Sequence, residues 1–248
     1  MLAAMAPIAT TASLVGLLLA SCGPASPAGS AAESAPASSP AVTGRAPALD
    51  PVSSPDWEAD MRRFAAADAA APPPVHPIVF TGSSSIRMWE SLAADFPGLP
   101  VLNRGFGGSQ VRDAAWYAEQ VAIRYRPSRV LLYAGDNDLN AGRSPEQVLA
   151  DFRAFVGRIR RDLPGVPIAF ISIKPSPSRA HLLPAMREAN ALIRAEAARM
   201  KGVAFIDVFT PMMGADGRPR AELFIEDQLH MNRAGYQLWR EIIAPHLR

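Results

Sequence analysis

A serine-rich turn follows the first strongly apolar run of the chain. Residues 78–80 are apolar, Gly82 ends the run, and Ser83, Ser84 and Ser85 precede a helix-like segment. A parallel α/β protein presents a hydroxyl in this way at the carboxyl edge of its first strand, where such sheets place their sites. A serine there is a candidate nucleophile. Covalent catalysis also needs a base, an orienting acid and donors for an oxyanion.

The elements that would position this serine alternate along the chain. Strands are expected at 77–81, 99–103, 129–134, 167–173 and 203–208, and helices at 109–125, 145–162, 184–200 and 232–246. The strand runs are almost continuously apolar, as is typical of strands covered on both faces. The pattern predicts an α/β fold, a three-layer α/β/α sandwich with a five-stranded parallel sheet. Right-handed crossovers would bring all the strand carboxyl ends to one edge.

Two helix starts carry local signals. Asp56 after Pro55 is a good N-cap for a helix with an apolar face, which we expect to pack on the domain. Ser144 is a possible N-cap for the helix at 145–162, with proline at the first helical position and Gln147 three residues after the cap.

Four loops that leave the predicted strands carry serine, glycine, asparagine or acidic residues. They are the segments at 82–85, 103–109, 134–138 and 227–232, which read Gly-Ser-Ser-Ser, Asn-Arg-Gly-Phe-Gly-Gly-Ser, Ala-Gly-Asp-Asn-Asp and Asp-Gln-Leu-His-Met-Asn. Because the carboxyl ends of the strands meet at one edge, we expect these loops to surround one site.

The four segments resemble, in the same order and at suitable separations, the motif blocks of the SGNH (GDSL-type) hydrolases. This superfamily contains esterases, lipases and carbohydrate acetylesterases. The resemblance covers the domain from about residue 77 to 248. It implies a flavodoxin-like α/β/α fold and hydrolysis of carboxylic esters without a cofactor or a metal. One short block alone is weak evidence, whereas four in order are specific.

The resemblance implies roles for particular residues. Ser84 matches the nucleophile. The family usually has aspartate before it, where this chain has Ser83, so Ser83 and Ser85 stay open as alternatives, with cap or turn roles favoured for both. The backbone N–H of Gly108 and the side-chain amide of Asn137, together with the Ser84 N–H, match the oxyanion donors.

His230 and Asp227 match the base and the acid of the last block. Their three-residue spacing can put both side chains on one side of a loop that turns into a helix. Among the four histidines of the chain, His181 is the competing base, although it is more readily interpreted as a pocket wall. Glu226 is a weaker alternative acid.

A divalent cation and a nucleotide-type cofactor are alternative ligands at this edge of the sheet. Asp136 and Asp138 raise the prospect of a divalent cation, but carboxylates in a loop are more often caps or solvated groups. The glycines at 105, 107 and 108 lack the G-x-G-x-x-G order of a dinucleotide loop, and those at 105 and 107 are interpreted as turn formers. A flavodoxin-like cofactor binder is the remaining rival of this kind.

The substrate pocket is expected to be lined from the loops after the second and fourth strands. The candidates are Arg104, Phe106, Lys174, Arg179 and His181. The first expectation is a short-chain acyl ester, above all an acetyl ester, of carbohydrate or a similar alcohol. The second is a lysophospholipid or other envelope lipid. A different class is a non-catalytic surface lipoprotein that binds glycan or a partner protein.

The first 55 residues have a composition unlike the rest. Residues 1–21 indicate a signal peptide with an uncharged apolar core, and its end, Leu19-Ala20-Ser21-Cys22, resembles the lipobox of bacterial lipoproteins. An ordinary signal peptide with a chance cysteine is the alternative, and residues 1–7 lack the usual lysine or arginine. Residues 22–55 would be a lipidated Cys22 and a disordered Ala/Pro/Ser linker, and residues 56–248 the hydrolase domain.

This organisation predicts an exported protein of the cell envelope, held to a membrane by its N-terminal lipid. The net charge of +2 and the lack of a basic cluster argue against nucleic acid as a partner. Cys22 is the only cysteine, which excludes an internal disulfide framework and a cysteine-based zinc site.

Overall fold

The computed structural model describes residues 55–247. The predictions made for residues 1–54, namely a signal peptide, a lipidated Cys22 and most of a linker, lie outside the described residues.

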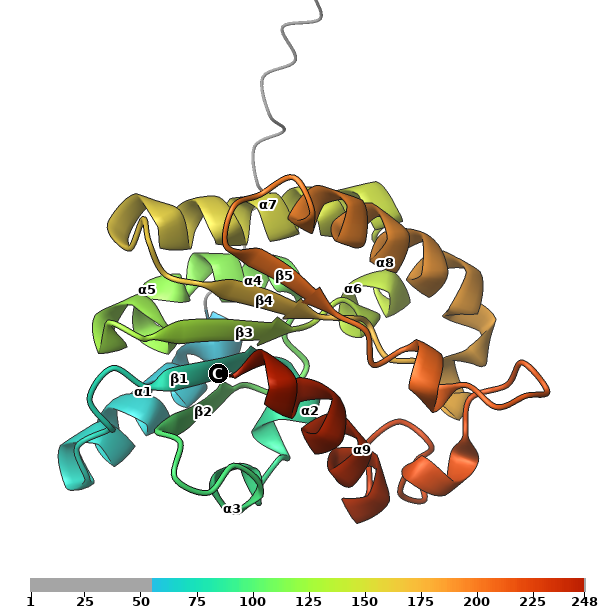
Figure 1. The fold of residues 1–248 in the computed structure, drawn as a ribbon, viewed down its shortest axis with the longest axis horizontal. Helices are drawn as coiled ribbons and strands as arrows, with labels where there is room; N and C mark the ends of the chain where they lie inside the picture. The colour runs from blue at the N-terminus through green and yellow to red at the C-terminus, as the bar shows by residue number, and fades with distance from the viewer. Residues whose placement is uncertain (1–54, 248) are drawn as a thin grey trace, which may run out of the picture. The chain divides into compact units, whose positions relative to one another are not determined.

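A five-stranded sheet forms the centre of this domain. Its strands are β1 (Ile78–Gly82), β2 (Val101–Gly105), β3 (Arg129–Tyr133), β4 (Ile168–Ile171) and β5 (Val203–Ile206). Their order in the sheet is β2-β1-β3-β4-β5, and every neighbouring pair is parallel. The prediction of a five-stranded parallel α/β sheet is confirmed. The strand arrows of Figure 1 all point toward the same side of the molecule, so their carboxyl ends share one edge.

Helices cover both faces of the sheet (Figure 1). One layer comprises α1 (Pro55–Ala70), α4 (Val111–Trp116), α5 (Ala118–Val121), α7 (Pro145–Asp162) and α8 (Leu183–Ala197), and the other α2 (Ser84–Arg87), α3 (Leu92–Asp95) and α9 (Arg233–Ile243). Successive residues of β1 alternate between them: Val79 packs in the first core and Phe80 in the second, and both are fully buried. This period of two lets each strand serve two cores.

The remaining helices are short. They are α6 (Asp136–Asn140) and the 3-10 helices η1 (Ile123–Tyr125), η2 (Pro177–Leu182), η3 (Thr210–Met212), η4 (Ala221–Leu223) and η5 (Ala244–His246). The prediction of one helix over 109–125 is wrong, because that stretch divides into α4, α5 and η1. Its buried residues occur all around the helical period rather than on one stripe, and the bends at Tyr117 and Ala122 turn them onto the core.

The N-cap predicted at Asp56 is wrong, because α1 begins at Pro55 and Asp56 lies in its first turn. The local signal for α7 is confirmed. The Gln147 N–H donates to Ser144 Oγ at 3.3 Å, and the Ser144 N–H donates to Gln147 Oε1 at 2.8 Å, which is a complete capping box. Phe64 of α1 is buried in the first core, and the ring of Trp57 meets that of Phe106 edge to face at 5.7 Å. Helix α1 is therefore an integral part of this domain.

Candidate active site

A cavity of about 430 Å³ opens at the edge where the strands end. Its lining residues come from six separate segments: Asp60, Ser84, Arg87, Gly107, Gly108, Asn137, Arg179, Leu229 and His230. Ser84, Gly108, Asn137 and His230, each named from a different loop of the sequence, thus border one space.

Ser84 is the first residue of α2, directly after β1. Its Oγ lies 3.0 Å from Nε2 of His230, which is hydrogen-bonding distance between a hydroxyl and an imidazole. Ser83 and Ser85 are buried; Ser83 occupies the N-cap position of α2, and the Ser85 carbonyl accepts a hydrogen bond from Tyr236. Of the three serines, only Ser84 places its hydroxyl within hydrogen-bonding distance of the His230 imidazole.

Asp227 holds the other side of that imidazole. Its Oδ2 lies 2.6 Å from His230 Nδ1, and its Oδ1 accepts the backbone N–H groups of Leu229 and His230, both at 2.9 Å. A side chain that bonds the backbone two and three residues ahead forms the turn itself, so the same carboxylate shapes the loop and orients the ring. Partial burial would raise the pKa of Asp227, but the hydrogen bonds from the His230 ring and from the two backbone N–H groups outweigh it and lower this pKa to about 2.

The loop ends in a defined helix start. Asn232 caps α9 by accepting the N–H groups of Ala234 and Gly235 at 2.9 and 3.2 Å. His230 therefore stands two residues before a fixed cap, which limits the freedom of its backbone.

Two further groups border the space beside Ser84. Gly108 has φ of +80°, a left-handed conformation that favours glycine, and its N–H has no acceptor among residues 55–247. Asn137 Nδ2 donates one hydrogen to the Ser109 carbonyl at 3.1 Å, which orients the amide and leaves its second hydrogen available. The Ser84 N–H, at the first position of α2, has no intrahelical acceptor either. These groups can donate to an oxyanion that forms on an acyl group attached to Ser84.

The two aspartates that flank Asn137 have protein partners. Asp138 is fully buried and accepts the Val111 N–H at 3.0 Å, and its burial raises its pKa to about 7. Asp136 Oδ2 lies 3.0 Å from Arg179 Nη1 and 3.5 Å from Lys174 Nζ. Within residues 55–247, no cluster of three or more His, Cys, Asp or Glu side chains could hold a metal ion.

Of the five residues expected to line the pocket, Arg179 lines the cavity and the other four do not. Phe106 is fully buried in the first core, and Arg104 is buried with Asp68 and the Tyr125 hydroxyl. Both lie inward because α1 packs over Arg104, near the end of β2, and over Phe106, which follows that strand.

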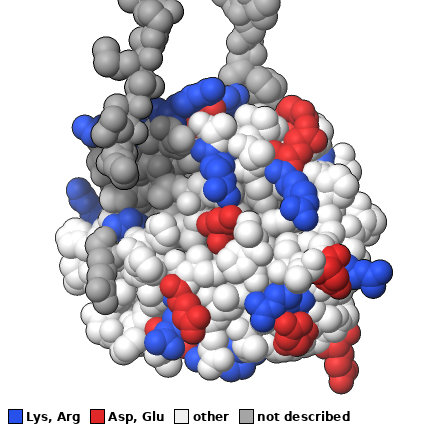
Figure 2. All heavy atoms as spheres, turned by 45° about the vertical axis from the view of Figure 1, so that its right-hand side comes forward, with Lys and Arg blue, Asp and Glu red and all other residues white. Residues whose placement is uncertain are grey.

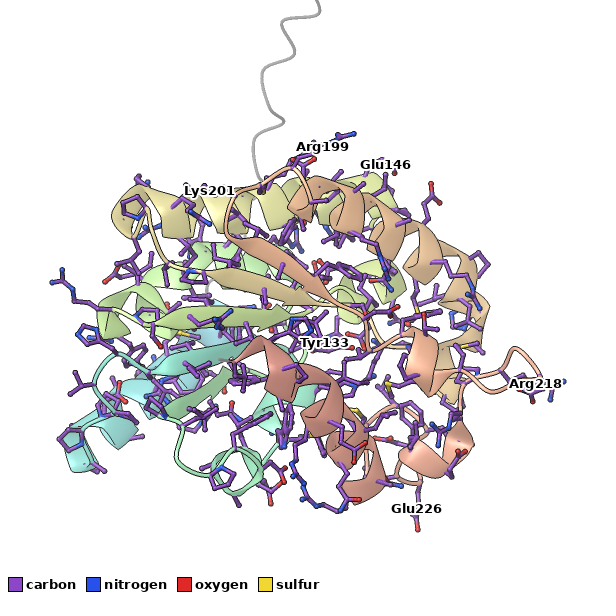
Figure 3. The ribbon with its side chains drawn as sticks, in the orientation of Figure 1. Tyr133, Glu146, Arg199, Lys201, Arg218 and Glu226 are labelled. Atoms are coloured by element: carbon purple, nitrogen blue, oxygen red, sulfur yellow. The ribbon has the colours of Figure 1, made fainter. Side chains whose placement is uncertain are left out.

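Lys174 and His181 also depart from that expectation. Lys174 is 1% exposed beside Asp136; burial lowers its pKa, and the Asp136 carboxylate opposes this. His181 is exposed and lies outside the cavity lining. Glu226, the alternative acid, is exposed as well and points away from the domain (Figure 3).

The cavity also has lining residues that the sequence reasoning missed. Arg87 is three residues after Ser84 on α2, and the spacing i, i+3 on a helix places two side chains on the same face. That spacing was a usable signal. Asp60 comes from α1, and no local pattern shows where that helix packs.

Residues 56–238 match the GDSL-like Lipase/Acylhydrolase family, and the chain belongs to that family. Membership of this family makes the protein a carboxylic ester hydrolase. None of the curated proteins matches the sequence.

Solved structures share the fold. A protein from Streptococcus pneumonia, described as a candidate platelet activating factor, superposes with a TM-score of 0.70 at 21% identity over 78% of this chain and 94% of that one. A GDSL-like lipase from Bacteroides thetaiotaomicron gives 0.65 at 20% identity over 76% and 97% of the two chains. A carbohydrate esterase family 3 protein from Talaromyces cellulolyticus gives 0.54 at 18% identity over 69% and 95%.

Proposed function

We propose that this protein is a serine esterase that hydrolyses short-chain acyl esters, above all acetyl esters, of carbohydrate or similar alcohols. The observation that carries the proposal is the continuous hydrogen-bonded chain from Ser84 through His230 to Asp227, with Ser84 and His230 both lining the cavity. A hydroxyl paired with an imidazole that a carboxylate orients is the arrangement that activates a serine nucleophile.

In this mechanism Ser84 Oγ attacks the ester carbonyl while His230 Nε2 takes its proton. The negative oxygen of the tetrahedral intermediate is stabilised by the N–H groups of Ser84 and Gly108 and by the Asn137 amide. His230 then gives its proton to the departing alcohol, which leaves an acyl group on Ser84. A water molecule, activated by His230, releases this acyl group as a carboxylic acid and restores the serine.

The lining of the cavity supports a short acyl group. Leu229 is the only aliphatic side chain among the described residues that line it, and the others are polar, charged or glycine. Each methylene of an acyl chain gains about 0.8 kcal/mol only when it is buried against apolar surface. A long chain would find little such surface here.

The first test is the variant Ser84→Ala with 4-nitrophenyl acetate. Loss of the nucleophile should lower kcat on the order of 10⁴–10⁶-fold. Ser83→Ala is the matched control, because the Ser83 hydroxyl has no hydrogen-bond partner among the described residues, and it should keep activity within about twofold. Fluorophosphonate should label Ser84 alone. A wild-type rate in Ser84→Ala, or no labelling of the native protein, would favour the non-catalytic binding lipoprotein instead.

The length of the acyl chain distinguishes short-chain acyl esters, the first substrate class, from lysophospholipids, the second. Release of acyl groups from 4-nitrophenyl esters of two to sixteen carbons, followed by lysophospholipid, should show kcat/KM falling as the chain lengthens. A rise with chain length would instead favour a lysophospholipase.

We also propose that the protein is exported and lipid-anchored through Cys22, on the evidence of the sequence before the domain. No helix within residues 55–247 is long and apolar enough to cross a membrane. Labelled palmitate should enter the full chain, and Cys22→Ala should lose the label and leave the membrane fraction. Equal labelling of both would exclude this anchor.

A further inference from the structure

Arg87 borders the catalytic cavity and has no charged partner among residues 55–247. It is the last residue of α2, one helical turn after Ser84, and it is exposed. It also borders a second cavity of about 300 Å³ beside α2 and β2. Among residues 55–247 no hydrogen bond or ion pair engages its guanidinium group. This guanidinium therefore has five N–H donors at the rim of the site, and none of them has an acceptor on the described domain.

The backbone beside the site leaves space for this guanidinium. A Cβ atom added to Gly107 would lie 2.7 Å from Arg87 Nε, closer than atoms in contact can stand. The φ of Gly107 is not positive, so backbone conformation does not require glycine there. A Cβ at this position would have to displace the exposed end of the Arg87 side chain. Arg87 thus lies against Gly107, directly before the Gly108 N–H assigned to the oxyanion.

A second guanidinium faces the same space. Arg179 lines the cavity, and its Nη1 donates a hydrogen bond to Asp136 Oδ2 at 3.0 Å. Asp136 has a second cation, Lys174, at 3.5 Å. The one carboxylate among the described lining residues is Asp60, which pairs with Arg63 at 2.6 Å.

The positive charge at the cavity is local. The face drawn in Figure 2 carries acidic and basic side chains interspersed, and the net charge of the chain is only +2. A preference for anions would therefore arise from Arg87 and Arg179 rather than from the field of the whole protein.

We propose that the active-site cavity selects esters that carry an anionic group, a carboxylate or a phosphate, close to the scissile bond, with Arg87 as its principal ligand and Arg179 as a second. The proposal rests on the proposed esterase function and names its substrate class. Guanidinium presents a planar fork of donors that matches carboxylate and phosphate oxygens. An arginine that lies beside the nucleophile and has no acceptor within residues 55–247 is placed to bind such a group.

The test compares matched acetyl esters with the full chain by measuring acetate release. Acetyl glycerol 3-phosphate against acetyl glycerol tests a phosphate, and O-acetyl-lactate against O-acetyl-lactamide tests a carboxylate. In at least one pair the anionic ester should have a kcat/KM about tenfold higher. Arg87→Gln should lower this ratio at least about fivefold, and Arg87→Lys, which keeps the charge without the fork, should fall between the two. The preference should shrink at high salt, because Arg87 is exposed.

Arg199→Gln is the control for charge, since Arg199 is an exposed arginine that lies far from Tyr133 and the ends of the strands in Figure 3. It should leave the ratio unchanged. A second readout does not depend on turnover of these esters: inorganic phosphate or succinate should slow fluorophosphonate labelling of Ser84 in the native protein and not in Arg87→Gln.

The possible failures are distinguishable. Equal kcat/KM for both members of each pair, or an equal loss for both in Arg87→Gln, would overturn the anion proposal while Ser84-dependent hydrolysis of the neutral esters left the esterase function standing. If labelling of Ser84 is insensitive to both anions, the anion proposal falls even where no ester in the panel is cleaved. Absence of labelling in the native protein would remove the esterase function itself.

Discussion

The two oxygen atoms of Asp227 have different partners, and the difference determines the tautomer of His230. Oδ1 takes two backbone N–H groups, and Oδ2 is left for Nδ1 of the ring. An ionised carboxylate can only accept, so Nδ1 must carry its proton. In the proposed mechanism, Nε2 is then free to take the proton of Ser84. A single side chain thus shapes the turn, orients the ring and selects the basic nitrogen.

Asp227→Asn tests this division of roles. The two backbone N–H groups should hold the amide oxygen at the Oδ1 position, which turns the NH2 group toward Nδ1. The ring must then carry its proton on Nε2 and cannot act as the base for Ser84. We expect kcat for 4-nitrophenyl acetate to fall by about 10²–10⁴-fold with little change in melting temperature. A fall of less than about tenfold would show that the carboxylate does not fix the tautomer.

The pKa of about 2 for Asp227 adds a pH criterion to the same residue. This carboxyl stays ionised throughout pH 4–9, so its protonation does not contribute to changes in rate over that range. Protonation of Asp227 should therefore add no acid limb to the activity in that range. A pH–rate profile of kcat/KM between pH 4 and 9 measures this, and an acid limb near pH 4 would contradict it.

At the scale of elements, Asp138 joins two helices below the site. It belongs to α6, directly after Asn137, and its carboxylate accepts the N–H of Val111, the first residue of α4. Asn137 in turn donates to the carbonyl of Ser109, on the loop that leads to α4. These two bonds hold the Gly108 loop and the Asn137 amide at a fixed separation.

Asp138→Asn should change how stability depends on pH. Burial raises the native pKa of Asp138 to about 7, whereas the unfolded chain releases this proton near pH 4. Between these values the native state binds more protons than the unfolded one, so stability is full below about pH 4 and declines up to about pH 7. The amide keeps an oxygen for the Val111 N–H and has no proton to lose, so the decline should weaken.

Urea unfolding of both proteins from pH 4 to 8 measures this effect. The unfolding free energy of Asp138→Asn should increase relative to that of the native protein as the pH rises to about 7. Above that pH the difference between the two proteins should stay constant. Parallel curves would mean that Asp138 titrates normally in the folded protein.

The elements also differ in how far they could be predicted from the sequence. The strands and α7 were predictable because apolar runs and the Ser144 cap are local signals. Helix α6 was not, because a single turn is too short to show a period, and α2 was expected only as a helix-like segment after Ser85, without bounds. Arg104 and Phe106 were expected to line the pocket from the loop after the second strand, yet both point inward. Arg104 lies within β2, which extends to Gly105 rather than ending at 103, and the direction of Phe106 depends on what packs over it.

At the scale of the whole domain, the packing of α1 explains why the side chains of Arg104 and Phe106 point inward. It packs over the end of β2, where Trp57 contacts Phe106 and Asp68 forms a buried ion pair with Arg104. The Tyr125 hydroxyl also donates to Asp68, at 2.6 Å. These contacts place Asp60, on the same helix, at the rim of the cavity. No pattern within 55–70 predicts them, because each needs a partner from another part of the chain.

The ion pairs of α1 allow a matched test of this packing. Asp68→Ala leaves the Arg104 guanidinium, whose side chain is 7% exposed, buried without its carboxylate. Removing one partner of a buried pair costs about 3–5 kcal/mol. Arg62→Ala, on the same helix, removes a partner of the exposed pair with Glu58 and should cost less than about 1 kcal/mol.

Unfolding free energies from urea titration compare these variants. The double variant Asp68→Ala with Arg104→Met removes both charges, so it should be more stable than Asp68→Ala alone. At temperatures where Asp68→Ala is still folded, its kcat for 4-nitrophenyl acetate should stay near that of the native protein, because neither Asp68 nor Arg104 lines the cavity. If Asp68→Ala and Arg62→Ala lost equally little stability, α1 would be only loosely attached, and the contact of Trp57 with Phe106 could not fix the loop that carries Gly108.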